Sequence, residues 1–94
     1  MGYTTRMLEK GLSLYEEAHT FPVCFIANNM DIALNHLQNT FVRMAVNRGH
    51  TVYKHMNRIK LDGGATFLFL SKSNLEIRMM GKLYADILFD NSCE

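Results

Sequence analysis

The sequence lacks several features that mark particular classes of protein. Its 94 residues include one proline, two cysteines and no tryptophan. The first residues contain no apolar segment of the signal-peptide type, and every apolar stretch is too short to cross a bilayer. We therefore expect neither a membrane protein nor a secreted domain built on disulfides, but a cytoplasmic protein in a reducing compartment.

Charge of either sign is not in excess, since ten Lys and Arg residues face nine Asp and Glu residues. A formal net charge of +1 gives no electrostatic case for strong nonspecific binding of nucleic acid. The histidines show no zinc-type spacing, so we expect no metal site. A hydrophobic fraction of 48% and this length are typical of one globular domain, residues 1–94.

Two long amphipathic helices are predicted from apolar residues at helical spacing. The first covers residues 5–19, and either Thr4 or Thr5 can cap its start. The second covers residues 30–48, after the N-cap candidate Asn29. The first carries charged residues on the side opposite its apolar stripe, and both helices are expected to pack on the sheet.

Strands are predicted between and after these helices. Residues 22–27 form a continuous apolar run, which is typical of a strand buried on both faces. The second helix is followed by a hairpin with strands at 56–62 and 65–71, a short helical segment at 74–80 and a strand at 84–89. This order predicts an α/β domain with a small, mainly parallel sheet, two long helices and a β-hairpin.

Two segments carry residue types that suit phosphate and magnesium. Gly2, Thr4 and Thr5 stand at the start of the first helix, where backbone N–H groups and a hydroxyl can face a phosphate and its metal ion. Asp90 ends an apolar strand, from which a carboxylate can hold the same ion through water. A simpler interpretation stays open, in which the threonines cap the helix and Asp90 begins a strand-exit turn.

In this order, these segments resemble the first half of a P-loop ATPase core of the kind found in phage terminases and superfamily-one helicases. The matching segments are residues 2–5, 23–27, 58–71, 78–81 and 87–90. The resemblance implies a P-loop-like fold in which Gly2, Thr4, Thr5 and Asp90 bind a nucleotide.

The sequence also departs from that family. The chain begins at Met1, so we expect the family's first strand and upstream glycines to be absent. Tyr3 stands where the family has the phosphate-binding lysine, and Asn91 stands where it has the glutamate that activates water. We therefore expect no enzymatic activity and no cofactor, with ATP and magnesium left open if another subunit supplies the missing groups.

The last predicted strand would then have an unpaired edge. Its residues Ile87, Leu88 and Phe89 are apolar and include no charge or proline that would block pairing. This pattern predicts a partner-binding edge, used either for a homodimer or for strand addition by another protein.

Three functions follow from these patterns. The leading hypothesis is a non-catalytic P-loop-like regulatory module, encoded by a phage or mobile element and acting in the host cytoplasm. It would work by protein–protein contact on a nucleic-acid machine, or as the inhibitor of a host defence complex. The second is a nucleotide-binding ATPase component completed by another subunit. The third is a small nucleic-acid-binding protein that uses the basic residues Arg43, Arg48, Lys54, Arg58 and Lys60.

Overall fold

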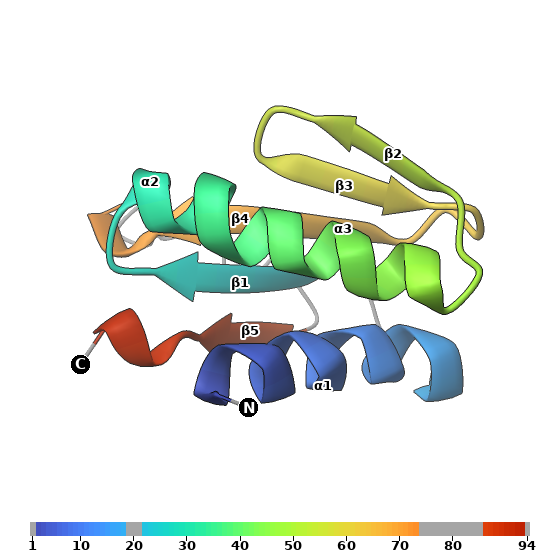
Figure 1. Cartoon of the computed structure of the whole chain (residues 1–94), viewed down its shortest axis with the longest axis horizontal. Coiled ribbons are helices and arrows are strands. Elements are labelled where there is room, and N and C mark those ends of the chain that lie inside the picture. Colours follow the sequence, from blue (N-terminus) through green and yellow to red (C-terminus); the bar gives the residue numbers. More distant parts are fainter. Residues whose placement is uncertain (1, 19–21, 74–85, 94) are drawn as a thin grey trace.

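The computed structural model describes residues 2–18, 22–73 and 86–93, which form a mixed β-sheet with helices on one face (Figure 1). The helices are α1 (Tyr3–Ala18) and a continuous helical segment made of α2 (Met30–Ile32), the π-helical η1 (Ala33–Leu37) and α3 (Gln38–Asn47). The other elements are β1 (Val23–Ala27), β2 (Val52–His55), β3 (Arg58–Leu61), β4 (Thr66–Ser71), β5 (Asp86–Phe89) and the short 3-10 helix η3 (Asn91–Cys93).

The described sheet has five strands in the order β2-β3-β4-β1-β5. β1 lies between β4 and β5 and is parallel to both, whereas β2, β3 and β4 pair in antiparallel fashion. The predicted α/β class and the hairpin of β3 and β4 are confirmed. The expectation of a mainly parallel sheet is wrong in part, because β2 adds a further antiparallel pair and makes the sheet mixed.

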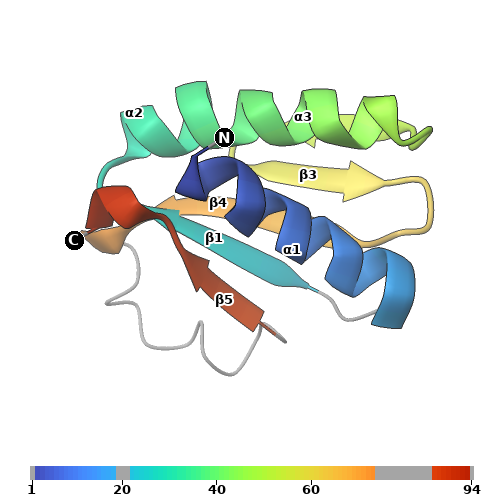
Figure 2. The ribbon, with the colours of Figure 1, turned by 60° about the horizontal axis from the view of Figure 1, so that its bottom comes forward.

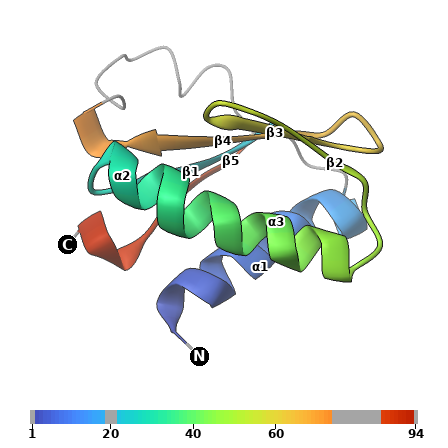
Figure 3. The same ribbon diagram turned by 45° about the horizontal axis from the view of Figure 1, so that its top comes forward.

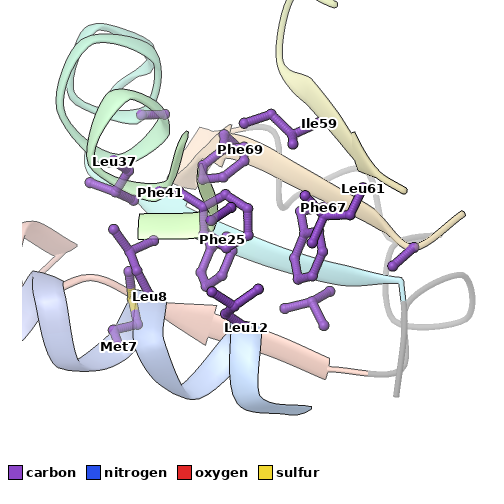
Figure 4. Packing of buried hydrophobic residues seen from close by; sticks show 14 of the residues in the cluster. Met7, Leu8, Leu12, Phe25, Leu37, Phe41, Ile59, Leu61, Phe67 and Phe69 are labelled. Carbon is purple, nitrogen blue, oxygen red and sulfur yellow. The ribbon is translucent and has the colours of Figure 1, made fainter. Parts of the chain in front are cut away.

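The main core lies between the sheet and the helices, which cover the same face (Figure 3). Its centre is aromatic (Figure 4): the ring of Phe41 from α3 lies 4.7 Å from that of Phe67 and 5.5 Å from that of Phe69, between centroids. Phe25 of β1 stacks on Phe69 at 5.1 Å. Such offset and tilted aromatic pairs stabilise a core beyond the apolar area that they bury.

Helix α1 packs closely on the sheet at Gly11. A Cβ atom at this position would lie 2.4 Å from Cζ of Phe25 and 3.5 Å from Cδ1 of Leu88. A residue with a side chain would therefore hold α1 away from β1 and β5. The missing side chain brings the first turns of α1 alongside the outer strand β5 (Figure 2).

The second helical segment has defined contacts at its start and near its middle. The side chain of Asn29 accepts a hydrogen bond from the amide of Ile32 at 2.9 Å, which confirms the predicted N-cap. Gln38 is 1% exposed, and its Nε2 donates to the carbonyl of Met56 at 2.8 Å. Met56 lies in the β2–β3 turn with φ of 54°, so a helix side chain holds a turn residue in the left-handed region.

The β3–β4 hairpin follows the predicted alternation. Ile59 and Leu61 are buried, while Arg58 and Lys60 are exposed. Gly64 in the turn has φ of 88°, a conformation that glycine adopts without strain. The predicted helical segment 74–80 and the first two residues of the predicted strand 84–89 lie outside the described residues.

The other face of the sheet carries a smaller apolar cluster. Cys24 and Ile26 of β1 pack with Leu68 and Leu70 of β4, and Ile87 of β5 lies against them. Cys24 is fully buried, and burial raises the pKa of its thiol to about 12. Cys24 therefore packs as a small buried hydrophobe, and a thiol in this state is a poor nucleophile.

Candidate functional site

The start of α1 meets the end of β5 at the carboxyl end of the parallel strands. Oγ1 of Thr4 donates a hydrogen bond to Oδ1 of Asp90 at 2.5 Å, and the Asp90 side chain is 3% exposed. The amide of Asp90 donates to the carbonyl of Ile26 at 2.8 Å, which fixes the end of β5 against β1. The two residues that the sequence singles out on distant elements are therefore direct neighbours.

A short turn after β5 completes the surroundings of Asp90. The amide of Ser92 donates to Oδ2 of Asp90 at 3.1 Å, and Oγ of Ser92 accepts from the amide of Asn28 at 3.1 Å. Burial raises the pKa of Asp90, but the hydrogen bonds from Thr4 and Ser92 outweigh burial and hold this pKa below its ordinary value. Asp90 is thus an ionised carboxylate at neutral pH.

The remaining residues predicted for the nucleotide site form no hydrogen bond with the Asp90 side chain in the part of the chain that the structure describes. Gly2 is exposed, and its carbonyl accepts the amide of Arg6 at 3.5 Å. Thr5 is half-buried. Because α1 begins at Tyr3, both threonines lie inside its first turn, and the interpretation of Thr4 or Thr5 as the helix cap is wrong. Instead, the Thr4 hydroxyl acts as a donor to a carboxylate.

The oxygen atoms of Thr4 and Asp90 have the character that magnesium prefers, since Mg²⁺ takes hard oxygen ligands and few protein groups. Within residues 2–18, 22–73 and 86–93, no group of three His, Cys, Asp or Glu side chains could hold a metal ion. A magnesium ion here would therefore depend on phosphate and water for most of its ligands.

Tyr3 occupies the position at which the resemblance places a lysine. Its hydroxyl donates to the carbonyl of Phe89 at 3.0 Å, and the side chain is 44% exposed. The tyrosine thus lies along the edge of β5 and brings no positive charge to the Thr4–Asp90 site. No sequence pattern indicates this contact, because it joins residues from opposite ends of the chain.

Strand β5 forms one edge of the described sheet, as the sequence predicts for Ile87, Leu88 and Phe89. Leu88 packs on the helix-covered core and Ile87 on the other face. Because Asp90 donates its amide to β1 and backbone groups alternate in direction along a strand, the N–H and C=O groups of Ile87 and Phe89 point away from β1. Of these groups, the Phe89 carbonyl is taken by Tyr3.

A groove of about 250 Å³ runs between α1 and this edge. It is lined by Tyr3, Arg6, Met7, Lys10, Leu88 and Phe89. In the described part of the chain, neither Arg6 nor Lys10 forms an ion pair. The groove therefore brings together apolar side chains, the edge of β5 and two cations that have no acidic partner among the described residues.

On the other side of α1, basic and acidic side chains are paired with one another. Arg48 pairs with Glu9 at 2.8 Å and with Glu16 at 2.5 Å. His50 contacts Glu16 through Nε2 at 2.7 Å and Asp62 through Nδ1 at 3.3 Å. The hydrogen bond with Glu16 raises the pKa of His50; burial opposes this, and Asp62 adds to it.

The five basic residues proposed for nucleic acid do not form one surface. Arg48 is paired with acids, and Arg43 is exposed on α3. The register pairs Lys54 with buried Ile59, so Lys54 lies on the helix-covered face of the hairpin, whereas Arg58 and Lys60 lie on the opposite face. The nucleic-acid hypothesis stays a prediction that rests on fewer residues.

No family model matches the chain, and neither a curated protein nor a solved structure shows a significant match. None of the helices in the described residues has the length and apolar character needed to cross a membrane.

Proposed function

We propose that this chain is a non-catalytic, P-loop-like binding module that acts by docking another protein against the edge of β5. The observation that carries the proposal is the outermost position of β5, whose last three residues are apolar and whose backbone groups at Ile87 and Phe89 point away from the sheet. Such an edge is a template for a further strand. The resemblance extends the proposal to a partner within a nucleic-acid machine or a host defence complex.

The P-loop-like part of the proposal is supported by the contact between Thr4 and Asp90 at the carboxyl end of parallel strands. In P-loop proteins, a hydroxyl at the helix start and an aspartate at a strand end share one magnesium ion. The non-catalytic part rests on Tyr3, which turns to Phe89, and on Asn91, whose amide cannot act as a base.

Hydrogen exchange and affinity capture test this function together. In the isolated chain, we expect the amides of Ile87 and Phe89 to exchange much faster than that of Leu88, which faces β1. A partner captured by the tagged wild-type chain should be lost from Ile87→Pro. Proline is tolerated where an edge N–H faces outward, so this variant removes a docking donor and keeps the pairing with β1.

The control for capture is Lys54→Ala on β2, which changes the opposite edge and should keep the partner. Light scattering on the isolated chain tests whether the partner is a second copy. A monomer whose Ile87 and Phe89 amides are protected would contradict the proposal, as would a partner that binds Ile87→Pro as well as the wild type.

A second candidate function is a nucleotide-binding ATPase component whose missing groups come from another subunit. The specific observation in its favour is the ionised, buried Asp90 beside the Thr4 hydroxyl. Under this function, titration calorimetry with ATP and magnesium should detect micromolar binding that Thr4→Ala abolishes. Thr5→Ala is the matched control, since the hydrogen bond to Asp90 comes from Thr4 and Thr5 forms none with it among the described residues. Absence of heat with the wild-type chain would remove this candidate for the chain alone.

A further inference from the structure

We infer that the groove between α1 and β5 binds an extended acidic segment of the partner protein, with two carboxylates at alternate positions. This inference rests on the proposed function and names the chemistry of the partner. Two observations carry it. The groove lies at the open edge of β5, and it contains Arg6 and Lys10, which lack acidic partners in the described part of the chain.

The spacing of the cations fits a strand. Arg6 and Lys10 are four residues apart on α1, about 6 Å along the helix axis. Alternate side chains of a β-strand lie about 6.6 Å apart on the same face. Since α1 runs alongside β5 (Figure 2), a strand added at this edge would present every second side chain to Arg6 and Lys10. The intervening side chains would lie on the side of Ile87 and should be apolar.

Tyr3 regulates access to the edge. An added strand forms hydrogen bonds with the outward groups of Ile87 and Phe89, but the Phe89 carbonyl already accepts the Tyr3 hydroxyl at 3.0 Å. An incoming strand must therefore displace this hydroxyl or forgo one hydrogen bond. Tyr3→Phe keeps the ring in the groove and frees the carbonyl, so it should strengthen docking by about threefold.

The probe is a short fluorescein-labelled peptide with two glutamates separated by one valine and flanked by valines, measured by fluorescence anisotropy at low salt. One control peptide carries lysines in place of the glutamates, and another has the same composition with the glutamates three positions apart. The wild-type chain should bind the alternating glutamate peptide about tenfold more tightly than either control. Added salt should reduce the difference.

Two charge-reversed variants distinguish the effect of the groove's own charges from the effect of the protein's net charge. Arg6→Glu with Lys10→Glu should remove the preference for the glutamate peptide. Arg43→Glu with Lys54→Glu makes the same change in net charge at exposed positions outside the groove and should keep that preference. An N-methyl group on the central valine blocks strand addition from the side of the peptide, and it should abolish binding without any change in the protein.

Equal binding of the three peptides, or a preference that survives the Arg6 and Lys10 reversals, would overturn the inference. So would tighter binding of a short oligothymidylate than of the glutamate peptide, because the cations would then serve a nucleic acid. If the peptide preference is absent but the partner is still lost from Ile87→Pro, only the acidic segment is wrong. If the partner also binds Ile87→Pro, the proposed docking function itself fails.

Discussion

The two edges of the described sheet differ in polarity and in neighbouring charge. β2, at one edge, exposes Tyr53, Lys54 and His55, and charged or polar side chains of this kind protect an edge from unwanted pairing. β5, at the other edge, ends in Ile87, Leu88 and Phe89. Near β5 the cations Arg6 and Lys10 are unpaired among the described residues, whereas Arg48 and His50 on the other side of α1 are paired with acids.

The difference indicates which side of the molecule has its charges paired internally and which side is suited to binding a partner. On the side of α1 that carries Arg48 and His50, called the paired side below, the basic and acidic side chains neutralise each other. The β5 side has outward backbone groups along the strand and, beside them, a groove with apolar side chains and two cations that are unpaired among the described residues. Three substitutions test the comparison.

The largest effect should come from forcing α1 away from β5. Gly11→Leu places a side chain where a single Cβ would already lie 2.4 Å from Phe25. We expect the free energy of unfolding, measured by denaturant titration, to fall by about 3 kcal/mol. Gly2→Ala is the control, because nothing lies within 4 Å of the added carbon. Unchanged stability in Gly11→Leu would mean that α1 does not pack tightly beside β5.

A smaller effect should come from pH on the paired side. The folded-state pKa of His50 is raised, so its contribution to stability is full below the unfolded value of about 6.5 and is lost as pH rises through the folded value. Glu16 and Asp62 have lowered pKa values, so their contributions are lost only at acidic pH. We expect the free energy of unfolding to fall by about 1 kcal/mol or less between pH 6 and pH 8.5.

His50→Gln should flatten this dependence when thermal unfolding is followed across the same pH range. His55→Gln serves as the control, since it alters an exposed histidine of β2 outside the network. If both variants keep the wild-type slope, the network does not contribute to stability.

The smallest effect on stability should come from making the protected edge resemble the open one. Lys54→Val removes a charge from β2, and we expect the free energy of unfolding to change by less than about 0.5 kcal/mol. Light scattering at high concentration should nevertheless detect new self-association through β2. Phe89→Lys, which adds a charge at the β5 edge, should show no such gain. Equal behaviour of the two variants would mean that edge polarity does not govern association.

The sequence predicts most of the parallel part of the fold. Apolar runs locate β1 and β4, helical spacing locates α1 and the second helical segment, and Asn29 marks a helix start. β2 escapes prediction because three of its four residues are exposed, so its sequence carries no alternation of buried and exposed residues. Its turn also gives no glycine signal, since the residue with positive φ is Met56.

In the candidate site, too, some contacts could be predicted from the sequence and others could not. The approach of Thr4 and Asp90 follows from their places at a helix start and a strand end, which meet at one end of a parallel sheet. The Tyr3–Phe89 hydrogen bond and the partners of Arg48 depend on how α1 lies across the sheet. So does the absence, among the described residues, of acidic partners for Arg6 and Lys10. That packing is set by three-dimensional contacts such as the one at Gly11, which a linear pattern does not encode.

The bond from Gln38 to Met56 has a consequence for how the hairpin of β2 and β3 finds its alignment. If β2 slipped by one residue along β3, the Met56 carbonyl would move away from the helix, and a buried amide group would lose its acceptor. Every misaligned form of the hairpin would carry this cost. The side chain of Gln38 thus favours the correct register of β2 on β3, which the exposed residues of β2 do not specify by themselves.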